Sequence, residues 1–75
     1  MKELVEVIAK ALVDNPDAVK VTEEEKDGEI YMELSVDPAD MGKVIGKQGR
    51  IAKAIRSVVK AAASREDKRA TLEIR

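Results

Sequence analysis

The sequence of 75 residues lacks several residue types on which common protein chemistries depend. It contains no cysteine, which excludes disulfide bonds and thiolate metal sites. It also contains no histidine, the commonest metal ligand and general base, so we expect no metal ion, no other cofactor and no enzymatic activity. Tyr31 is the single aromatic residue. A surface that stacks bases on several aromatic side chains is therefore excluded.

Long apolar runs are missing as well. No run approaches the roughly 18 residues of a membrane-spanning helix. The N-terminal stretch Met-Lys-Glu-Leu-Val-Glu carries acidic residues and lacks the apolar core of a signal peptide. We therefore expect a soluble, cytoplasmic protein without a membrane partner, and the short length predicts one domain over residues 1–75.

Charge is distributed unevenly along the chain. The formal net charge is −1, from 14 basic and 15 acidic residues. Residues 41–65 nevertheless hold half of the basic residues and no acidic residue. The basic residues of this segment are Lys43, Lys47, Arg50, Lys53, Arg56, Lys60 and Arg65. This asymmetry predicts a local anion-binding site, not a generally basic protein.

Hydrophobic periodicity predicts six elements in the order α-β-β-α-α-β. Asn15-Pro16 should end the first helix, since proline disfavours helical geometry at the residue before it. Asp27-Gly28 favours a hairpin turn because both residues tolerate positive φ. The expected elements are a helix over residues 2–14, a strand over 19–22, a strand over 30–36, a short helix from Asp37-Pro38 to Gly46, a helix from about Gly49 to Ser64 and a strand over 70–74.

Each expected strand has one apolar face, which predicts how the elements pack. The fold class is α/β (α+β): a two-layer sandwich in which three helices cover one face of a three-stranded mixed sheet. At the second helix we expect Asp37 as N-cap and Pro38 at the first helical position. Gly46 should form a left-handed C-terminal cap.

The third expected helix is amphipathic. Its apolar face comprises Ile51, Ala54, Ile55, Val58 and Ala62. Lys53, Arg56 and Lys60 lie opposite, where they either bind phosphate or form an ordinary solvated surface. Val59 falls at the margin of the apolar face and should be partly exposed. With the alanines at 61–63 it predicts either a homodimer contact through this helix or ordinary marginal packing.

Residues 44–51, Val-Ile-Gly-Lys-Gln-Gly-Arg-Ile, contain a Gly-x-x-Gly pattern at the expected helix–helix junction. Two glycines allow positive φ and close backbone approach, and a helix N-terminus beside them favours a phosphate. The pattern is not a Walker A loop, because Arg50 follows the second glycine. Nor is it a Rossmann loop, which needs a third glycine and a strand leading into it.

The element order, with Gly-x-x-Gly between the fourth and fifth elements, resembles a type II KH domain over essentially the whole chain. The length, residues 42–56 and the ending Val-Val-Lys-Ala-Ala-Ala resemble the small bacterial single-KH-domain RNA-binding proteins, the KhpA family. One position differs from the usual KH pattern: KH motifs often carry a bulky aliphatic residue where this chain has Ala52. We expect Ile51 and Ile55 to supply that packing.

The resemblance implies that about four nucleotides of single-stranded RNA, or of single-stranded DNA, lie across the turn. It further implies an RNA chaperone or post-transcriptional regulator that pairs with itself or with a KH protein of the Jag (KhpB) type. The expected nucleic-acid contacts are Lys43, Ile45, Gly46, Lys47, Gln48, Gly49, Arg50 and Lys53. The alternative is a protein-interaction module with a KH fold that does not bind nucleic acid.

Overall fold

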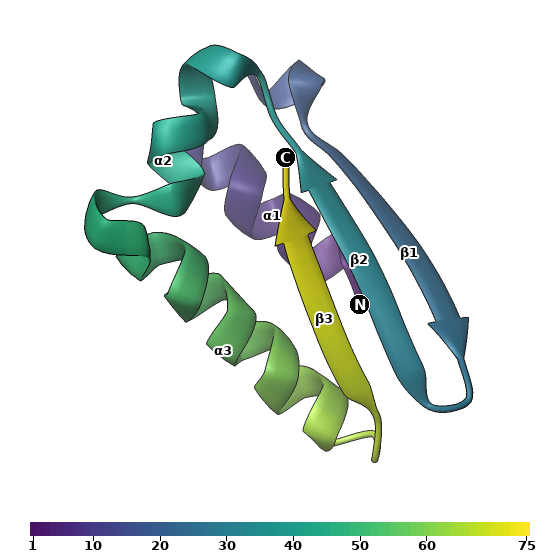
Figure 1. Ribbon diagram of the computed structural model, residues 1–75. Helices are drawn as coiled ribbons and strands as arrows, with labels where there is room; N and C mark the ends of the chain where they lie inside the picture. Colours follow the sequence, from purple (N-terminus) through teal and green to yellow (C-terminus); the bar gives the residue numbers. More distant parts are fainter.

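The computed structural model describes all residues, 1–75, and confirms the predicted order of elements (Figure 1). Short 3₁₀ turns lie at Pro16–Ala18, Pro38–Asp40 and Lys47–Gly49. The helices and strands are α1 (Lys2–Leu12), β1 (Lys20–Lys26), β2 (Glu29–Ser35), α2 (Met41–Ile45), α3 (Arg50–Ser64) and β3 (Arg69–Ile74).

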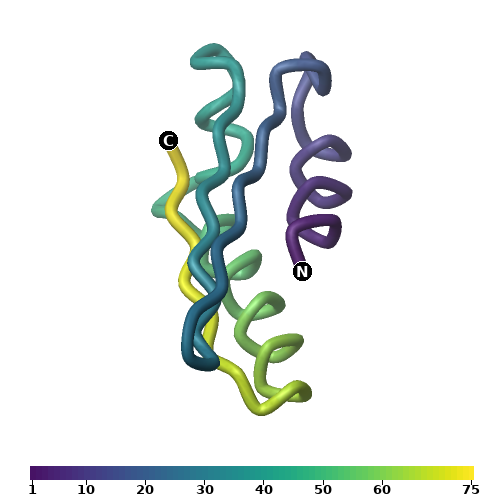
Figure 2. Tube along the Cα trace, turned by 90° about the vertical axis from the view of Figure 1, so that its right-hand side faces the viewer, coloured from purple at the N-terminus to yellow at the C-terminus, as the bar shows by residue number.

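The three strands form one mixed sheet in the order β1-β2-β3. β1 pairs with β2 in antiparallel fashion through the turn at Asp27 and Gly28, which both adopt positive φ. β3 returns parallel to β2, with Met32 paired to Leu72. Figure 2 shows α1 and α3 on the same side of the strands, so the predicted two-layer α+β fold is confirmed.

The core lies between the sheet and the helices. Met32 and Leu34 of the central strand are fully buried, together with Val5 of α1, Val44 of α2 and Val59 of α3. Strand residues alternate between the two faces, so the opposite sheet face carries polar side chains. Every helix therefore meets the same apolar surface of the sheet.

The ends of α1 and β1 differ most from the prediction. α1 ends at Leu12, because Val13 already has extended backbone angles. β1 continues to Lys26 and so includes Glu23–Glu25, which lie beyond the strand expected over residues 19–22. The antiparallel ladder with β2 explains the longer strand, since it pairs backbone groups whatever the side chains are, and these glutamates are exposed.

The prediction of which face of α3 is buried is wrong, because the helix is rotated about its axis relative to the expected orientation. The residues buried in α3 are Ala52, Ile55, Val59 and Ala63. Val59 is 1% exposed whereas Val58 is 45% exposed, the reverse of the expectation. Ala54 is also exposed. α3 packs mainly on β3, and this contact determines which of two adjacent apolar stripes faces inward.

Candidate nucleic-acid interface

The Gly-x-x-Gly segment joins α2 to α3, as predicted. Contacts at the start of α2 hold that helix, and so the segment, in place. The Asp37 carboxylate accepts a hydrogen bond from the backbone N–H of Ala39 at 2.9 Å, which confirms the predicted cap. The helix opens with a 3₁₀ turn before its α-helical part. Asp40, buried in that turn, accepts a hydrogen bond from the backbone N–H of Asn15 at 3.0 Å. The base of α2 is thereby tied to the end of α1.

Gly46 ends α2 in a conformation that differs from the predicted left-handed cap. Its φ is +76° but its ψ is 173°, so the chain leaves the helix in an extended direction. A Cβ atom at this position would lie 2.6 Å from Cγ1 of Ile51. Glycine is required here both for the backbone angles and for the close approach of Ile51.

Gln48 and Gly49 both adopt left-handed backbone angles, with φ of +58° and +73°. The Gly49 N–H donates to the Gly46 carbonyl at 3.1 Å and closes the turn. A Cβ at Gly49 would meet nothing, so only the backbone angle demands glycine there. Left-handed geometry at the non-glycine Gln48 is uncommon, and no local pattern predicts it.

Exposed polar side chains surround this turn. Lys47, Gln48, Arg50 and Lys53 are all exposed. An Nη atom of Arg50 donates to Oε1 of Gln48 at 3.3 Å. None of the three cations forms an ion pair with a carboxylate. Their charge is therefore available to an anionic ligand, and the turn brings these predicted site residues together.

Lys43 differs from the other predicted cations because carboxylates already hold it. Its ammonium pairs with Asp14 and, at 3.3 Å, with Asp40. These hydrogen bonds raise the pKa of Lys43. Burial of Asp40 opposes its ionisation, but the amides of Asn15 and Asp14 and the Lys43 ammonium outweigh burial and lower the pKa of Asp40. Lys43 thus joins α1 to α2 instead of facing solvent as a free charge.

Ile45 is the last residue of α2, directly before the turn. It is half-buried and packs against the hydrophobic core. Its partial exposure leaves an aliphatic surface beside Gly46, which suits the predicted groove floor. Ala52 is buried, and Ile51 packs beneath Gly46, so the small side chain at 52 is accommodated by its neighbours.

Arg56 has a defined position that the sequence did not reveal. Its side chain is half-buried, and Nε donates to the backbone carbonyl of Leu72 in β3 at 3.1 Å. The backbone N–H of Arg75 donates to Leu34 of β2, and that of Arg69 donates to Gly28 directly before β2. By the alternation of a strand, the peptide groups of Leu72 therefore face away from β2. Arg56 therefore caps the free edge of β3 and is not simply part of a solvated surface.

No cluster of three or more acidic side chains is placed to hold a metal ion. None of the helices combines the length and the apolar character needed to cross a membrane.

Comparison with known proteins agrees with this architecture. The family model described as "KhpA/KhpB, KH domain" matches residues 2–74. Proteins called "RNA-binding protein KhpA" are similar to the chain over 99% of its length: that of Caldanaerobacter subterraneus subsp. tengcongensis at 66% identity, that of Clostridium perfringens at 65% and that of Aquifex aeolicus at 54%. The chain covers 99%, 99% and 94% of these relatives, respectively. Their names are not those of enzymes, in agreement with the sequence-based expectation. The chain belongs to the KhpA/KhpB family of KH domains.

Proposed function

We propose that this protein binds single-stranded RNA across the Gly46–Gly49 turn. The observation that carries the proposal is the turn itself, in which two glycines with positive φ present Lys47 and Gln48 to solvent beside cations without carboxylate partners. The relatives named as RNA-binding proteins support the choice of RNA. The strand would lie with phosphates at the turn and along the start of α3, and bases against Ile45.

The expected mode of binding is modest in affinity and sensitive to salt. No aromatic side chain lies at the turn, so base stacking contributes little there. If about four phosphates of a single strand are neutralised, log affinity should fall with log salt at a slope of roughly −3. We propose that the protein acts in the cytoplasm as an RNA chaperone or post-transcriptional regulator, with a second KH chain increasing its affinity.

The test is a fluorescence anisotropy titration of a labelled mixed-sequence RNA at two salt concentrations. Lys47→Asp with Gln48→Asp should abolish binding while circular dichroism stays unchanged. Lys20→Asp with Thr22→Asp makes the same change in net charge on exposed positions of β1 and serves as the matched control. Unchanged affinity in the folded Lys47/Gln48 variant would refute the assignment of this turn. A DNA strand of the same sequence shows whether the 2′-hydroxyl is read.

A second candidate function, association with another KH chain, is favoured by an apolar groove between α1 and α3. The α1/α3 groove has a volume of about 330 Å³. Its lining residues are Ile8, Leu12, Arg50, Ile51, Ala54, Ile55 and Val58. Val58 stands 45% exposed at this surface, so the predicted helix contact would centre on Val58 and not on Val59. We propose a symmetric homodimer, or a heterodimer with a KhpB-type protein, through this groove.

Self-association is tested separately from RNA binding. Sedimentation of the wild type across a concentration series should show a dimer, and Val58→Asp should give a monomer with an unchanged helical spectrum. Ser57→Asp, on an exposed position of the same helix outside the groove, makes the same change in net charge and serves as the control. A wild type that stays monomeric at the highest concentration would rule out the homodimer and direct the search to a heterologous KH chain.

A further inference from the structure

A polar cavity lies away from the Gly46–Gly49 turn, around the beginning of β3. This cavity, the β3 trough, has a volume of about 390 Å³. It is lined by Glu29, Tyr31, Lys60, Lys68, Arg69, Ala70 and Thr71. A smaller hollow of about 180 Å³ adjoins it, shares Lys60, Ala70 and Thr71 with it, and extends it to Arg56. The size of the trough falls within the range of small-ligand sites.

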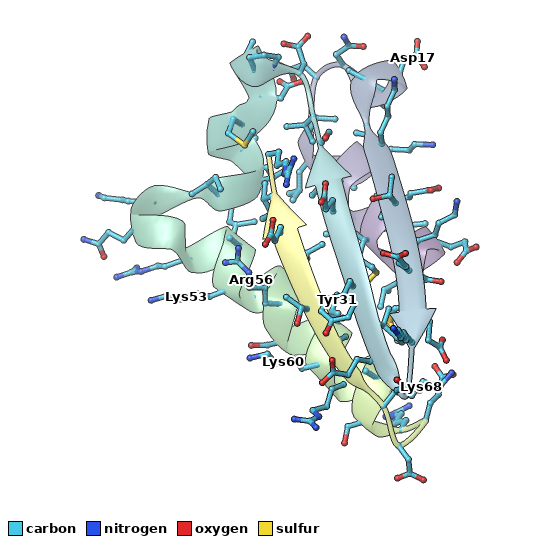
Figure 3. All side chains as sticks on the ribbon, turned by 45° about the vertical axis from the view of Figure 1, so that its right-hand side comes forward. Asp17, Tyr31, Lys53, Arg56, Lys60 and Lys68 are labelled. Atoms are coloured by element: carbon cyan, nitrogen blue, oxygen red, sulfur yellow. The ribbon has the colours of Figure 1, made fainter.

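The trough wraps around the free edge of β3. Lys60 comes from α3, on the helix side of the sheet, whereas Tyr31 belongs to the exposed sheet face. Figure 3 shows both side chains, with Tyr31 lying over the strands and Lys60 on the neighbouring helix. The backbone N–H of Arg69 donates to the carbonyl of Gly28, directly before β2, so by strand alternation the peptide groups of Ala70 point outward toward the trough.

The charge of the trough favours an anionic ligand, because three cations and one carboxylate line it. Lys68 pairs with Glu25 at 2.9 Å, and Arg69 lies 3.8 Å from Glu29. Lys60 forms no ion pair, so its ammonium is the unneutralised charge in the trough. A phosphate placed at Lys60 would not have to displace a carboxylate.

Tyr31 gives the trough a feature that the glycine turn lacks. It is the only aromatic residue of the chain, and it is 49% exposed. Its hydroxyl donates to the carboxylate of Glu29 on the same strand, which holds the ring across the sheet surface. Every nucleobase has a π-face, so an exposed ring beside a free cation suits a nucleotide regardless of sequence.

A row of cations connects the glycine turn to the trough. Lys53, Arg56 and Lys60 follow at intervals of three and four residues, which places them on one side of α3 (Figure 3). At 1.5 Å per residue, the helix advances about 15 Å from Arg50 to Lys60. A strand held at the turn can therefore follow this row down to the trough.

We propose that the β3 trough is a second nucleotide subsite, in which a base of the same RNA strand rests on Tyr31 and its phosphate contacts Lys60. This inference rests on the proposed function, since the turn must hold the first part of the strand. The footprint of the protein is then longer than the four or so nucleotides that a Gly-x-x-Gly turn accommodates.

The first experiment compares variants on labelled RNAs of four and eight nucleotides. A longer strand offers more binding registers to any protein, so the informative comparison is between variants at one length. Lys60→Ala and Tyr31→Ala should leave four-nucleotide affinity unchanged and weaken eight-nucleotide binding, Tyr31→Ala by roughly fivefold. Tyr31→Phe keeps the ring but loses the hydroxyl bond to Glu29, so it should bind the eight-nucleotide RNA more tightly than Tyr31→Ala. Lys20→Ala, on the opposite edge strand β1, controls for loss of one positive charge.

The second experiment needs no substitution. Because the chain has no Phe, Trp or His, the aromatic carbon–proton NMR spectrum of labelled protein contains Tyr31 alone. The eight-nucleotide RNA should shift these signals, and the four-nucleotide RNA should not.

The outcomes separate the two proposals. The Lys47/Gln48 variant could lose binding while the wild type, Lys60→Ala and Tyr31→Ala bind the eight-nucleotide RNA equally well. That result would overturn the proposal of a second subsite and leave the proposed function of the turn standing. Tyr31 chemical shifts that stay unchanged on addition of the eight-nucleotide RNA would also overturn the proposal of a second subsite. RNA binding that survives in the Lys47/Gln48 variant would instead refute the proposed function.

Discussion

Replacement of Gly46 by alanine should destabilise this protein much more than replacement of Gly49, although both glycines belong to one motif. At Gly49 the left-handed angles cost a non-glycine residue about 1–2 kcal/mol, and the added Cβ enters open space. At Gly46 the combination of positive φ and extended ψ is essentially restricted to glycine and costs of order 1–3 kcal/mol.

Steric overlap adds to the cost at Gly46. The new Cβ would lie 2.6 Å from Cγ1 and 2.9 Å from Cδ1 of Ile51, and such overpacking typically costs a further 1–3 kcal/mol or so. Gly46→Ala should therefore lose about 2–6 kcal/mol of the free energy of unfolding. That is a large share of the roughly 4–11 kcal/mol expected for 75 residues.

Urea denaturation followed by circular dichroism measures both variants, at one protein concentration so that self-association does not differ. If Gly46→Ala is unfolded in buffer, a stabilising osmolyte brings all proteins into range. Adding Ile51→Ala removes Cγ1 and Cδ1, so the double-mutant cycle should show favourable coupling of about 1 kcal/mol. Equal losses at Gly46 and Gly49, or no coupling with Ile51, would refute the reasoning.

Three other expectations follow from the packing of the chain. Val59→Ala should cost about 2 kcal/mol because Val59 is fully buried, and Val58→Ala less than about 0.5 kcal/mol under monomeric conditions; a reversed order in urea titrations would contradict the observed helix face. Asp40→Asn should destabilise most at neutral pH. Because the pKa of Asp40 is lowered in the folded state, the ionised carboxylate stabilises the fold above its ordinary pKa, and this stabilisation is lost as pH falls through the pKa of the folded state. A difference in free energy of unfolding between wild type and variant that stays constant from about pH 6 to pH 3 would contradict this expectation. Arg56→Ala should cost about 1 kcal/mol through the lost carbonyl bond, and Lys53→Ala almost nothing in the same denaturation assay.

Local sequence patterns predicted the glycine turn and the element order well. Asp37 caps the second helix as expected, because an N-cap depends only on residues within one turn. The hairpin at Asp27 and Gly28 is likewise a property of two adjacent residues. The exact backbone of Gly46 was not predictable, since its ψ depends on how Ile51 packs beneath it.

Long-range contacts account for what the sequence could not predict about the site. Lys43 and Lys47 look alike in sequence, but only Lys43 pairs with Asp14, because the segment that follows α1 lies beside α2. Arg56 and Lys53 differ in the same way, since only Arg56 reaches the free edge of β3. In each case a partner distant in the chain decides whether a cation is free.

The chemistry available to this protein can be read from the residues alone: a cation-rich segment without acids, a Gly-x-x-Gly pattern between predicted helices, and no thiol or imidazole. Periodicity also determined the layers, because it reports which side of an element is apolar. The rotation of α3, and thus the exposure of Val58, depends on packing between elements, as does the cavity that Tyr31 and Lys60 both line. A helix with two adjacent apolar stripes can bury either of them, and the packing of β3 and α1 selects one.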